Sequence, residues 1–536
     1  MIAPKRVLSK SHPPDVKPPS VAMARRALIA CKPRTWRRTL RGGLGWTGLI
    51  IAATGWAQTQ SPATDALAVE QRIQRIQDGL LPPVLIKGGP NQTTKLSDRM
   101  TELHVPGVSM AVIHGGGLEW ARGFGVTKIG GAAVTSGTLF QAGSISKPVT
   151  AMAVLHLAQS GRLDLDADVN QYLKAWKIPA SGFTEQNKVT LRELLSHTAG
   201  MTVHGFPGYA AGSPVPTLVQ VLDGAAPANS APIRVDAVPG KAWRYSGGGY
   251  VVVQQLLTEV TGQQFPELMQ DTVLGPIGMA RSTYEQPLPA GRMAEASMPY
   301  SWTGQAVPGG PHTYPEMAPA GLWTTPSDLA RYAMEVQASL AGKANHVLSA
   351  SMTREMLTPG LGHYGLGLSV GGDARRRYFS HGGANAGYQC FLMAYEDGDG
   401  TIIMTNGDDG GDLAQEILRT IAAEYGWPDF RPIEHAIATV DPRSFDAFVG
   451  RYRISPAVVC TITREGDRLF TQATGTPKTR LYPMSEREFF LVEVDARFTF
   501  APEVNGRVRE LIVHTMGQEV RIKRLSDAEA KSLAEP

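Results

Sequence analysis

The sequence has few cysteines and no ligand spacing typical of a metal site. Of 536 residues only Cys31, Cys390 and Cys460 are cysteine, and the last two lie in apolar, strand-like segments where a thiol usually packs as a small hydrophobic group. No His and Cys spacing indicates zinc, and residues 164–168, which open like a calcium loop, lack the turn glycine and the closing glutamate. Dinucleotide-binding and Walker loops are also missing. We therefore expect no disulfide, no metal and no cofactor.

The chain also lacks a long hydrophobic run and, beyond residue 57, an excess of basic charge. Residues 1–57 hold eleven of the 52 Lys and Arg, with four arginines before the short apolar run 44–53 and small residues before Gln58. This order is typical of an export signal, and the run is too short to span a bilayer. We predict cleavage near Ala57 and a periplasmic or secreted protein without a stable membrane span. The remaining 41 basic and 47 acidic residues suggest no nucleic-acid partner.

Apolar periodicity and turn residues predict a mixed α/β domain with an antiparallel sheet. Residues 95–104 suit a short helix, and residues 107–125 suit a hairpin that turns at three glycines. Helical spacing follows over 144–159 and 250–261, and the sequence from Thr325 has a cap residue, a proline and an aspartate typical of a helix start. Helices inserted among hairpin strands imply a sheet flanked by helices.

The pattern changes after residue 428. From 448 to 523, short strand-like runs alternate with turn signals and no helical period appears, which predicts a separate all-β, barrel-like domain. We therefore divide the chain into an export segment (1–57), a catalytic domain (66–430), a linker (431–440) and a C-terminal β-domain (441–536).

Ser144 and Lys147 form an S-x-x-K motif at the start of the helix predicted over 144–159. The motif alone is weak evidence, since a capping serine followed by a solvated lysine gives the same letters. Its position adds weight, because a helix N-terminus stabilises an alkoxide and an oxyanion. One turn further on, a desolvated lysine amine can accept the proton of the serine hydroxyl.

The segment around this motif resembles a known family. Residues 140–150, F-Q-A-G-S-I-S-K-P-V-T, are similar to the nucleophile segment of class C β-lactamases, D,D-peptidases and family VIII esterases. Further stretches follow in that family's order: 194–201 resembles its conserved loop, 239–246 its tyrosine segment, 276–279 and 320–325 its later landmarks, and 381–383 its K-T-G or H-x-G strand. The C-terminal β-domain resembles the lipocalin-like domains attached to some of these hydrolases.

The resemblance implies a β-lactamase/transpeptidase-like fold and a role for each matched residue. Tyr245 would be the second proton carrier beside Lys147, and the backbone N–H of Ala384 would complete an oxyanion hole with that of Ser144. His381 and Gly383 would line the site, with His381 binding a polar or anionic group of the substrate.

One position departs from the family pattern. Where the family has Y-x-N, this sequence has Tyr245, Ser246 and Gly247, so the amide that usually contacts the lysine and the substrate is missing. Ser-Lys-Tyr proton transfer can operate without that amide, whereas its loss counts against strong recognition of β-lactams or peptides. The substitution therefore favours ester hydrolysis.

A rival constellation resembles the α/β-hydrolases. Residues 114–117 are similar to their oxyanion loop, and residues 367–371 match their G-x-S-x-G elbow around Ser369. The elbow requires a helix directly after the serine, but residues 372–377 have no apolar helical face. We interpret both segments as glycine turns and strands.

The sequence thus predicts a serine hydrolase that acts through an acyl-enzyme on an ester, amide or β-lactam carbonyl of a small-molecule or peptide-like substrate, with esters favoured. A β-lactamase or D-amino-acid peptidase is the alternative within the same chemistry. A non-catalytic receptor for peptidoglycan or another ligand is the alternative of a different class.

Overall fold

The computed structural model describes residues 62–531 except 90–91, 457, 503–506 and 516–517. The described residues fall into two compact units. The larger unit contains 62–81 and 93–431, and the barrel unit combines 82–92 with 432–531. The predicted export segment and Cys31 lie outside the described residues.

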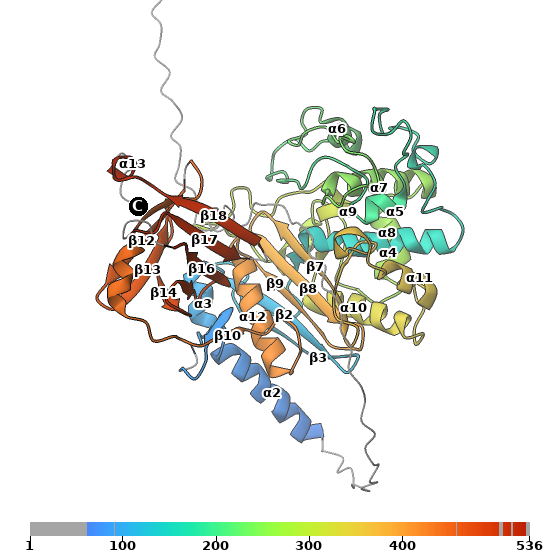
Figure 1. The fold of residues 1–536 in the computed structure, drawn as a ribbon. Helices are drawn as coiled ribbons and strands as arrows, with labels where there is room; N and C mark the ends of the chain where they lie inside the picture. Colours follow the sequence, from blue (N-terminus) through green and yellow to red (C-terminus); the bar gives the residue numbers. More distant parts are fainter. Residues whose placement is uncertain (1–61, 90–91, 457, 503–506, 516–517, 532–536) are drawn as a thin grey trace, which may run out of the picture. The chain divides into compact units, whose positions relative to one another are not determined.

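A six-stranded antiparallel sheet forms the middle of the larger unit (Figure 1). The predicted N-terminal hairpin is present and pairs directly with the last strand of the sheet in sequence, in the order β3-β2-β9-β8-β7-β6. The strands are β2 (Gly107–His114), β3 (Gly117–Gly125), β6 (Ser369–Gly372), β7 (Arg377–Asn385), β8 (Tyr388–Tyr395) and β9 (Gly400–Thr405).

Alternating side chains give the sheet two apolar faces. In β2, Val108, Met110 and Val112 belong to one core and Ala111 and Ile113 to the other. Helices α2 (Pro62–Asp78) and α12 (Gly410–Glu424) pack on the first face, and α10 (Pro326–Leu340) packs on the second (Figure 1). Because strand side chains alternate with period two, both faces are buried and the sheet lies between layers of helix.

A helical region extends the second face, and its longest helices are α4 (Ser146–Gln159) and α7 (Gly247–Thr261). The other helices and turns of the larger unit are α3 (Leu96–Glu102), η1 (Gly143–Ile145), η2 (Val169–Gln171), α5 (Leu191–Leu195), α6 (Leu218–Asp223), α8 (Phe265–Met269), the π-helical η3 (Gln270–Leu274), η4 (Ala290–Glu295), α9 (Met317–Ala320), α11 (Ala350–Met356) and η5 (Leu361–His363), and strands β4 (Phe140–Gln141) and β5 (Trp323–Thr324) form a small pair.

The predicted helices are present, with two differences at their starts. Helix α7 begins at Gly247, three residues earlier than expected, because the Ser246 hydroxyl accepts a hydrogen bond from the N–H of Gly249 and caps the helix. Thr325 caps α10 as predicted. The carboxylate of Asp328, however, accepts hydrogen bonds from Arg281 and Ser282, so it anchors a neighbouring loop to the helix start.

The C-terminal β-domain is a closed eight-stranded barrel, as the sequence predicted. Its interior is filled by packed aromatic and aliphatic side chains, among them a stacked pair, Phe448 and Phe500, with ring centroids 4.3 Å apart. The strands are β11 (Gly450–Arg453), β12 (Val459–Glu465), β13 (Arg468–Ala473), β14 (Thr479–Pro483), β15 (Glu488–Phe490), β16 (Ala496–Phe500), β17 (Glu510–Thr515) and β18 (Gln518–Arg524), with η6 (Pro442–Ala447) before them and α13 (Asp527–Lys531) after them.

The barrel unit also contains an element that the sequence did not reveal. Strand β10 (Ile433–His435), inside the predicted linker, pairs in parallel with β1 (Val84–Ile86), which lies far away in the sequence. Val84 packs with Phe490 and Val492 of the barrel unit. The domain limits given above stay a prediction, and the structure adds that residues 82–92 group with the barrel.

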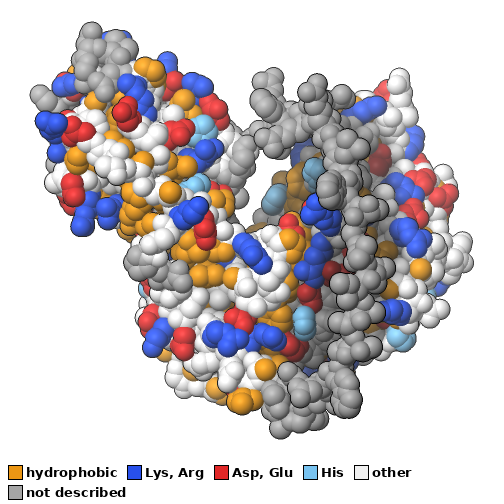
Figure 2. Space-filling view, turned by 60° about the horizontal axis from the view of Figure 1, so that its bottom comes forward, with side chains coloured by type: hydrophobic (Ala, Val, Ile, Leu, Met, Phe, Trp, Pro, Cys, Tyr) orange, Lys and Arg blue, Asp and Glu red, His pale blue; other side chains and the backbone are white. Residues whose placement is uncertain are grey.

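Ion pairs connect several helices of the larger unit. Arg99 bonds Glu416 at 2.8 Å, and Arg75 bonds Glu424 at 2.5 Å, so α3 and α2 are each tied to α12 by an ion pair. On the face shown in Figure 2, basic and acidic side chains are interspersed. Within the part of the chain that is described, no helix is both long and apolar enough to cross a membrane.

Candidate active site

Ser144 lies in the turn η1, directly before the buried helix α4. Its neighbours Gly143 and Ile145 are buried, whereas Ser144 itself is partly exposed. The Ser146 hydroxyl fixes this turn, because it donates to the carbonyl of Gly143 at 2.6 Å and accepts from the N–H of Leu322. The turn therefore presents a serine hydroxyl at the N-terminal end of a helix, where the helix dipole favours negative charge.

Lys147 contacts Ser144 from within the core. Its Nζ lies 2.8 Å from the Ser144 Oγ and 3.0 Å from the carbonyl oxygen of Pro319. The side chain is only 2% exposed, and its nitrogen lies 4.9 Å from the centroid of the Tyr245 ring. The structure thus brings the two residues of the S-x-x-K motif into direct contact.

Burial lowers the pKa of the Lys147 amine well below its usual range. The reason is desolvation, which penalises the charged ammonium, and no carboxylate forms an ion pair with Lys147 among the described residues. A neutral amine has two N–H groups and one lone pair. It can donate to Pro319 while its lone pair accepts the hydroxyl proton of Ser144, which is the arrangement of a general base.

The Tyr245 side chain is also close to the serine hydroxyl. Burial raises the pKa of its phenol above the usual range, and a hydrogen bond with the Ser144 side chain offsets only part of that rise. The phenol is therefore protonated at neutral pH and suited to donate or relay a proton. The two pKa shifts have opposite directions, so burial favours a neutral amine at Lys147 and a protonated phenol at Tyr245.

A buried histidine, for which the sequence predicted no role, supports Tyr245. The His197 ring lies 4.2 Å from the Tyr245 ring and 5.5 Å from the Tyr250 ring. Its Nδ1 accepts the backbone N–H of Ser246, which follows Tyr245 in the chain. His197 lies in the 194–201 loop, so the resemblance identified the loop but not this function of packing against the tyrosine.

The backbones of η1 and β7 pack closely together at the place where the oxyanion hole is predicted. Gly143 has φ of +51°, and a Cβ there would lie 2.6 Å from the backbone nitrogen of Ala384. A Cβ on Gly383 would lie 1.9 Å from the carbonyl oxygen of Ala142. Only glycine at 143 and 383 allows this approach, which places the N–H of Ala384 next to the turn that holds Ser144.

His381 is buried, and its surroundings favour the uncharged imidazole. Desolvation, and the charge of Lys147 whenever that amine is protonated, lower the pKa of His381 to about 3. Its Nδ1 lies 2.5 Å from the carbonyl oxygen of Gly382, so Nδ1 carries the proton. A neutral imidazole can bind a polar group, but it offers no positive charge to an anionic one.

These residues line one open cavity of about 500 Å³. Trp243, 40% exposed, and Phe391 give it apolar walls. None of its lining residues is Asp, Glu, Lys or Arg, and no cluster that could hold a metal ion occurs among the described residues. The lining residues are Ser144, His204, Trp243, Tyr245, Tyr364, Ser369, His381, Gly382, Gly383, Ala384, Gln389, Cys390, Phe391, Gly411, Ala414 and Gln415.

The structure explains why glycine occupies position 247. A Cβ there would lie 3.0 Å from the Phe206 ring and 3.1 Å from the carbonyl oxygen of His204. The N–H of Gly247 also donates to that carbonyl at 3.0 Å. The loop that contains His204 thus packs directly on the backbone where the family pattern has an asparagine.

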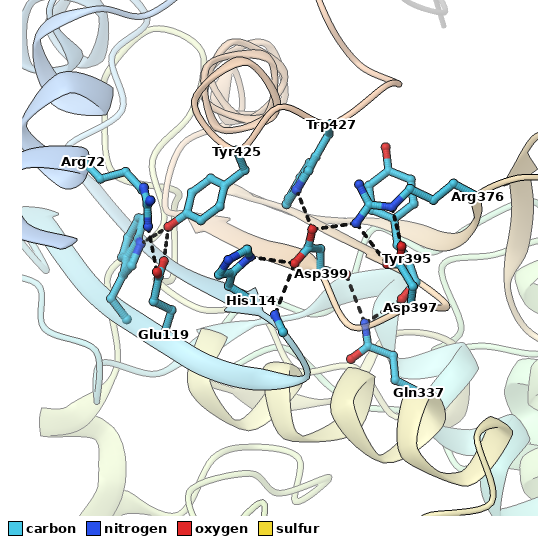
Figure 3. Close-up of polar contacts among 12 residues, drawn as sticks. Arg72, His114, Glu119, Gln337, Arg376, Tyr395, Asp397, Asp399, Tyr425 and Trp427 are labelled. Atoms are coloured by element: carbon cyan, nitrogen blue, oxygen red, sulfur yellow. Dashed lines mark hydrogen bonds and ion pairs between the residues drawn. The ribbon is translucent and has the colours of Figure 1, made fainter. Parts of the chain in front are cut away.

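The rival α/β-hydrolase constellation is not assembled. Ser369 lines the cavity, but it lies in β6, paired with Ser380 of β7 in a hairpin, and no helix follows it. His114 ends β2 and its Nδ1 lies 2.8 Å from the Asp399 carboxylate, which also accepts from Trp427 and Arg376 (Figure 3). Both segments are glycine turns and strands, as predicted.

A buried carboxyl near the site was not predicted. Glu316 precedes α9, the helix whose Pro319 carbonyl bonds Lys147, and it is fully buried. Neither carboxyl oxygen has a hydrogen-bond partner among the described residues. Desolvation raises the pKa of Glu316 to about 7. The only sequence signal was a glutamate in a segment of Pro, Ala and Met.

Comparison with known proteins agrees with this geometry. The family profile described as beta-lactamase matches residues 93–425, and a domain of unknown function (DUF3471) matches residues 434–524. The chain belongs to the beta-lactamase family of serine hydrolases.

Individual relatives carry names from the same family. The chain is 24% identical to "Penicillin-binding protein 4*" of Bacillus subtilis, over 79% of this chain and 96% of that protein. It is 26% identical to penicillin-binding protein 4 of Amycolatopsis lactamdurans, over 60% and 87%. The octameric penicillin-binding protein homologue from Pyrococcus abyssi has the same fold, with a TM-score of 0.56 at 22% identity, over 80% and 98%.

Proposed function

We propose that this protein hydrolyses uncharged carbonyl compounds, esters above all, through a covalent acyl-enzyme on Ser144. The observation that carries the proposal is the 2.8 Å contact between the Ser144 hydroxyl and the Lys147 amine, which is buried without a carboxylate partner among the described residues. Desolvation lowers the pKa of such an amine and favours its neutral, basic form, and the Lys147 nitrogen lies within hydrogen-bond distance of the serine hydroxyl.

In the first step Ser144 Oγ attacks the substrate carbonyl carbon while its proton passes to Lys147 Nζ. The carbonyl oxygen becomes an oxyanion opposite the N–H groups of Ser144 and Ala384. When the bond to the leaving group breaks, Tyr245 donates its phenol proton to the departing oxygen and regains one from Lys147. This leaves an ester on Ser144, a free alcohol and a neutral Lys147, and water then releases the acid.

The preference for uncharged substrates follows from the charges around the cavity. A β-lactam or a C-terminal peptide has a carboxylate that needs a cation, whereas the described residues that line this cavity include neither Lys nor Arg. His381, the residue expected to meet such a group, stays neutral with a pKa of about 3. Gly247 offers no side-chain amide for an acylamino group. An ester with apolar substituents suits the Trp243 and Phe391 walls better.

The relatives favour a second candidate. Two of them are named penicillin-binding proteins, and one of these covers 79% of this chain. A β-lactamase or D-amino-acid peptidase would use the same Ser144, Lys147 and Tyr245 chemistry. The two candidates therefore differ in substrate and not in mechanism.

The test measures kcat/KM for p-nitrophenyl esters, nitrocefin and D-amino-acid p-nitroanilides. We expect esters to be hydrolysed fastest, and Ser144→Ala to abolish all hydrolysis. Ser369→Ala is the matched control, because it removes another serine hydroxyl from the same cavity and should keep most activity. Faster hydrolysis of nitrocefin or the anilides would favour the second candidate.

A fluorophosphonate probe separates an enzyme from a receptor. Labelling of the wild-type protein that is lost in Ser144→Ala supports the proposal. No labelling together with no turnover on any of the three substrates would favour the non-catalytic receptor.

We also propose that the protein is exported and cleaved near Ala57, because basic residues precede a short apolar run in residues 1–57. Expression of the full chain in a Gram-negative host followed by N-terminal sequencing of the periplasmic fraction tests this. A cytoplasmic protein that retains residues 1–57 would contradict it.

A further inference from the structure

The cavity that contains Ser144 is lined by a further titratable group, His204, which belongs neither to the S-x-x-K motif nor to the tyrosine segment. His204 lines the same cavity as Ser144 and Tyr245, and its ring centroid lies 4.9 Å from that of Tyr245. Neither ring nitrogen of His204 has a hydrogen-bond partner among the described residues, unlike the nitrogens that fix His197 and His381 through backbone groups. An imidazole without a fixed partner is free to bind water in the cavity.

The loop around His204 is held firmly in place. The Ser246 hydroxyl donates to the carbonyl of Thr202 at 2.6 Å, and the N–H groups of Gly247 and Gly248 donate to the carbonyls of His204 and Val203, both at 3.0 Å. Val203 has φ of +62°, a conformation that is strained for a β-branched residue. The backbone is therefore strained at Val203, and the hydrogen bonds around it fix the position of the next residue, His204.

Burial and a neighbouring amine favour the neutral form of His204. Partial burial lowers the pKa of the imidazole below its usual range, and the charge of Lys147, when that amine is protonated, lowers it further. The other titratable groups that face it are His197 and Tyr245, and neither supplies a negative charge at neutral pH. A neutral imidazole has one nitrogen lone pair, so it can accept a proton.

We propose that His204 is a catalytic residue of the second half-reaction, in which it activates the water that cleaves the acyl-enzyme on Ser144. This rests on the proposed function. The water oxygen bonds to the acyl carbon while one water proton passes to the free nitrogen of His204. The bond between the acyl carbon and Ser144 Oγ then breaks, and Tyr245 donates its proton to Oγ. Tyr245 regains a proton from His204, which restores all three groups.

A division of labour between two bases follows from this geometry. Lys147 is only 2% exposed and its Nζ lies 2.8 Å from Ser144 Oγ, so it is well placed for the serine proton. His204 is exposed to the cavity, where water enters, and is placed for the second proton. Loss of His204 should therefore slow deacylation and spare acylation.

Stopped-flow hydrolysis of p-nitrophenyl acetate by the full-length protein measures both steps. The burst reports acylation, and the steady-state rate reports deacylation. In His204→Gln we expect a burst rate within about threefold of wild type and a steady-state rate about 100-fold lower, the size expected for loss of a general base. Mass spectrometry of acid-quenched enzyme should show an acetyl group accumulating on Ser144.

Two further variants keep the test decisive. His363→Gln removes another exposed imidazole, outside the cavity lining, and should leave both phases unchanged. His204→Ala creates space, and added imidazole should restore its steady-state rate without changing the burst; this variant also serves if His204→Gln does not fold.

The outcomes separate this inference from the function on which it rests. Equal slowing of burst and steady state, or unchanged turnover in folded His204 variants, would overturn the role of His204 while a burst in the wild type still supports the acyl-enzyme. Absence of any Ser144-dependent burst in the wild type, with turnover unaffected by Ser144→Ala, would instead overturn the proposed function.

Discussion

Two polar clusters in the larger unit differ in whether their buried ionisable group has a partner of opposite charge. At the active site, Lys147 is buried, its hydrogen-bond partners among the described residues are a hydroxyl and a carbonyl, and its pKa is lowered. At the hairpin ends of the sheet, Asp399 accepts hydrogen bonds from Arg376, His114 and Trp427 (Figure 3). Burial alone would raise the pKa of Asp399, but these donors outweigh burial and hold it below its usual range.

The contrast distinguishes a cluster suited to catalysis from a cluster that stabilises the fold. A buried group that meets no opposite charge loses its own charge and becomes reactive, whereas a carboxylate with several donors stays ionised and ties strands together. The second cluster continues to Tyr425, which accepts from Trp120 at 2.8 Å and donates to Glu119, and Glu119 pairs with Arg72 at 2.7 Å. Every charge in that cluster is paired, so we expect it to affect stability and not turnover.

The largest effect is expected for Lys147→Met. Met has a similar shape and cannot accept the Ser144 proton, so ester hydrolysis should fall by about 10³-fold, within the range for loss of a general base. Because the variant removes an ionisable group buried without a counter-charge, its free energy of unfolding should equal or exceed that of wild type. Steady-state kinetics and urea denaturation measure the two quantities. Lys343→Met, at an exposed lysine, is the control and should change neither.

The same variant gives a pH test. The folded-state pKa of Lys147 is lowered, so the unfolded chain binds its proton up to about the ordinary value of 10.5 while the folded protein does not. Wild-type stability should therefore rise with pH between the lowered pKa and 10.5, relative to Lys147→Met. A pH-independent difference between the two proteins would contradict a buried neutral amine.

Glu316 is a second buried ionisable group without a hydrogen-bond partner among the described residues, and it is an acid where Lys147 is a base. We expect its ionisation to change the free energy of unfolding by about 3 kcal/mol. Its pKa is about 7 in the folded protein and 4.5 ordinarily, so the folded state holds a proton that the unfolded chain releases. Relative to Glu316→Gln, wild type should lose stability as pH rises from 4.5 to 7, by about 3 kcal/mol in total, and no more above 7. Urea denaturation at pH 4.5, 6 and 8 checks this. Equal stability of both proteins at all three pH values would show that Glu316 has a partner in solution.

A smaller loss is expected from the paired cluster. Asp399→Asn keeps the shape but leaves Arg376 without its partly buried partner, so we expect a loss of about 2 kcal/mol, between the values for exposed and buried pairs. Asp397 bonds the same arginine from a 54% exposed position, so Asp397→Asn is a matched control that should cost under about 1 kcal/mol. Neither should change kcat; a loss of turnover in a folded Asp399→Asn protein would break the proposed division between the clusters.

The two clusters differ in how much of each could be predicted from the sequence. Ser144, Lys147 and Tyr245 were predictable because a local motif and ordered family segments carried them, and the hairpin and barrel followed from period-two alternation. The partners of Asp399 were not predictable, because no local pattern pairs it with Arg376 or Trp427, and His114 lies 285 residues away in the sequence. The pairing of β1 with β10 was also not predictable, because the two strands lie far apart in the sequence. The lowered pKa of His381 depends on burial in the folded protein, which a local sequence pattern does not indicate.

The smallest effect concerns position 247, where the active-site cluster departs from its family. Restoring the family residue with Gly247→Asn looks like a gain of function in the sequence alone. In the structure the new Cβ meets Phe206 at 3.0 Å and the His204 carbonyl at 3.1 Å, so overpacking should cost about 1 kcal/mol. Gly291→Asn, at an open position, is the control and should be neutral. We expect Gly247→Asn to lower ester turnover by displacing His204, without raising nitrocefin hydrolysis. A variant as stable as wild type that gained nitrocefin turnover would show that the loop yields easily, and that the missing amide alone had set the substrate preference.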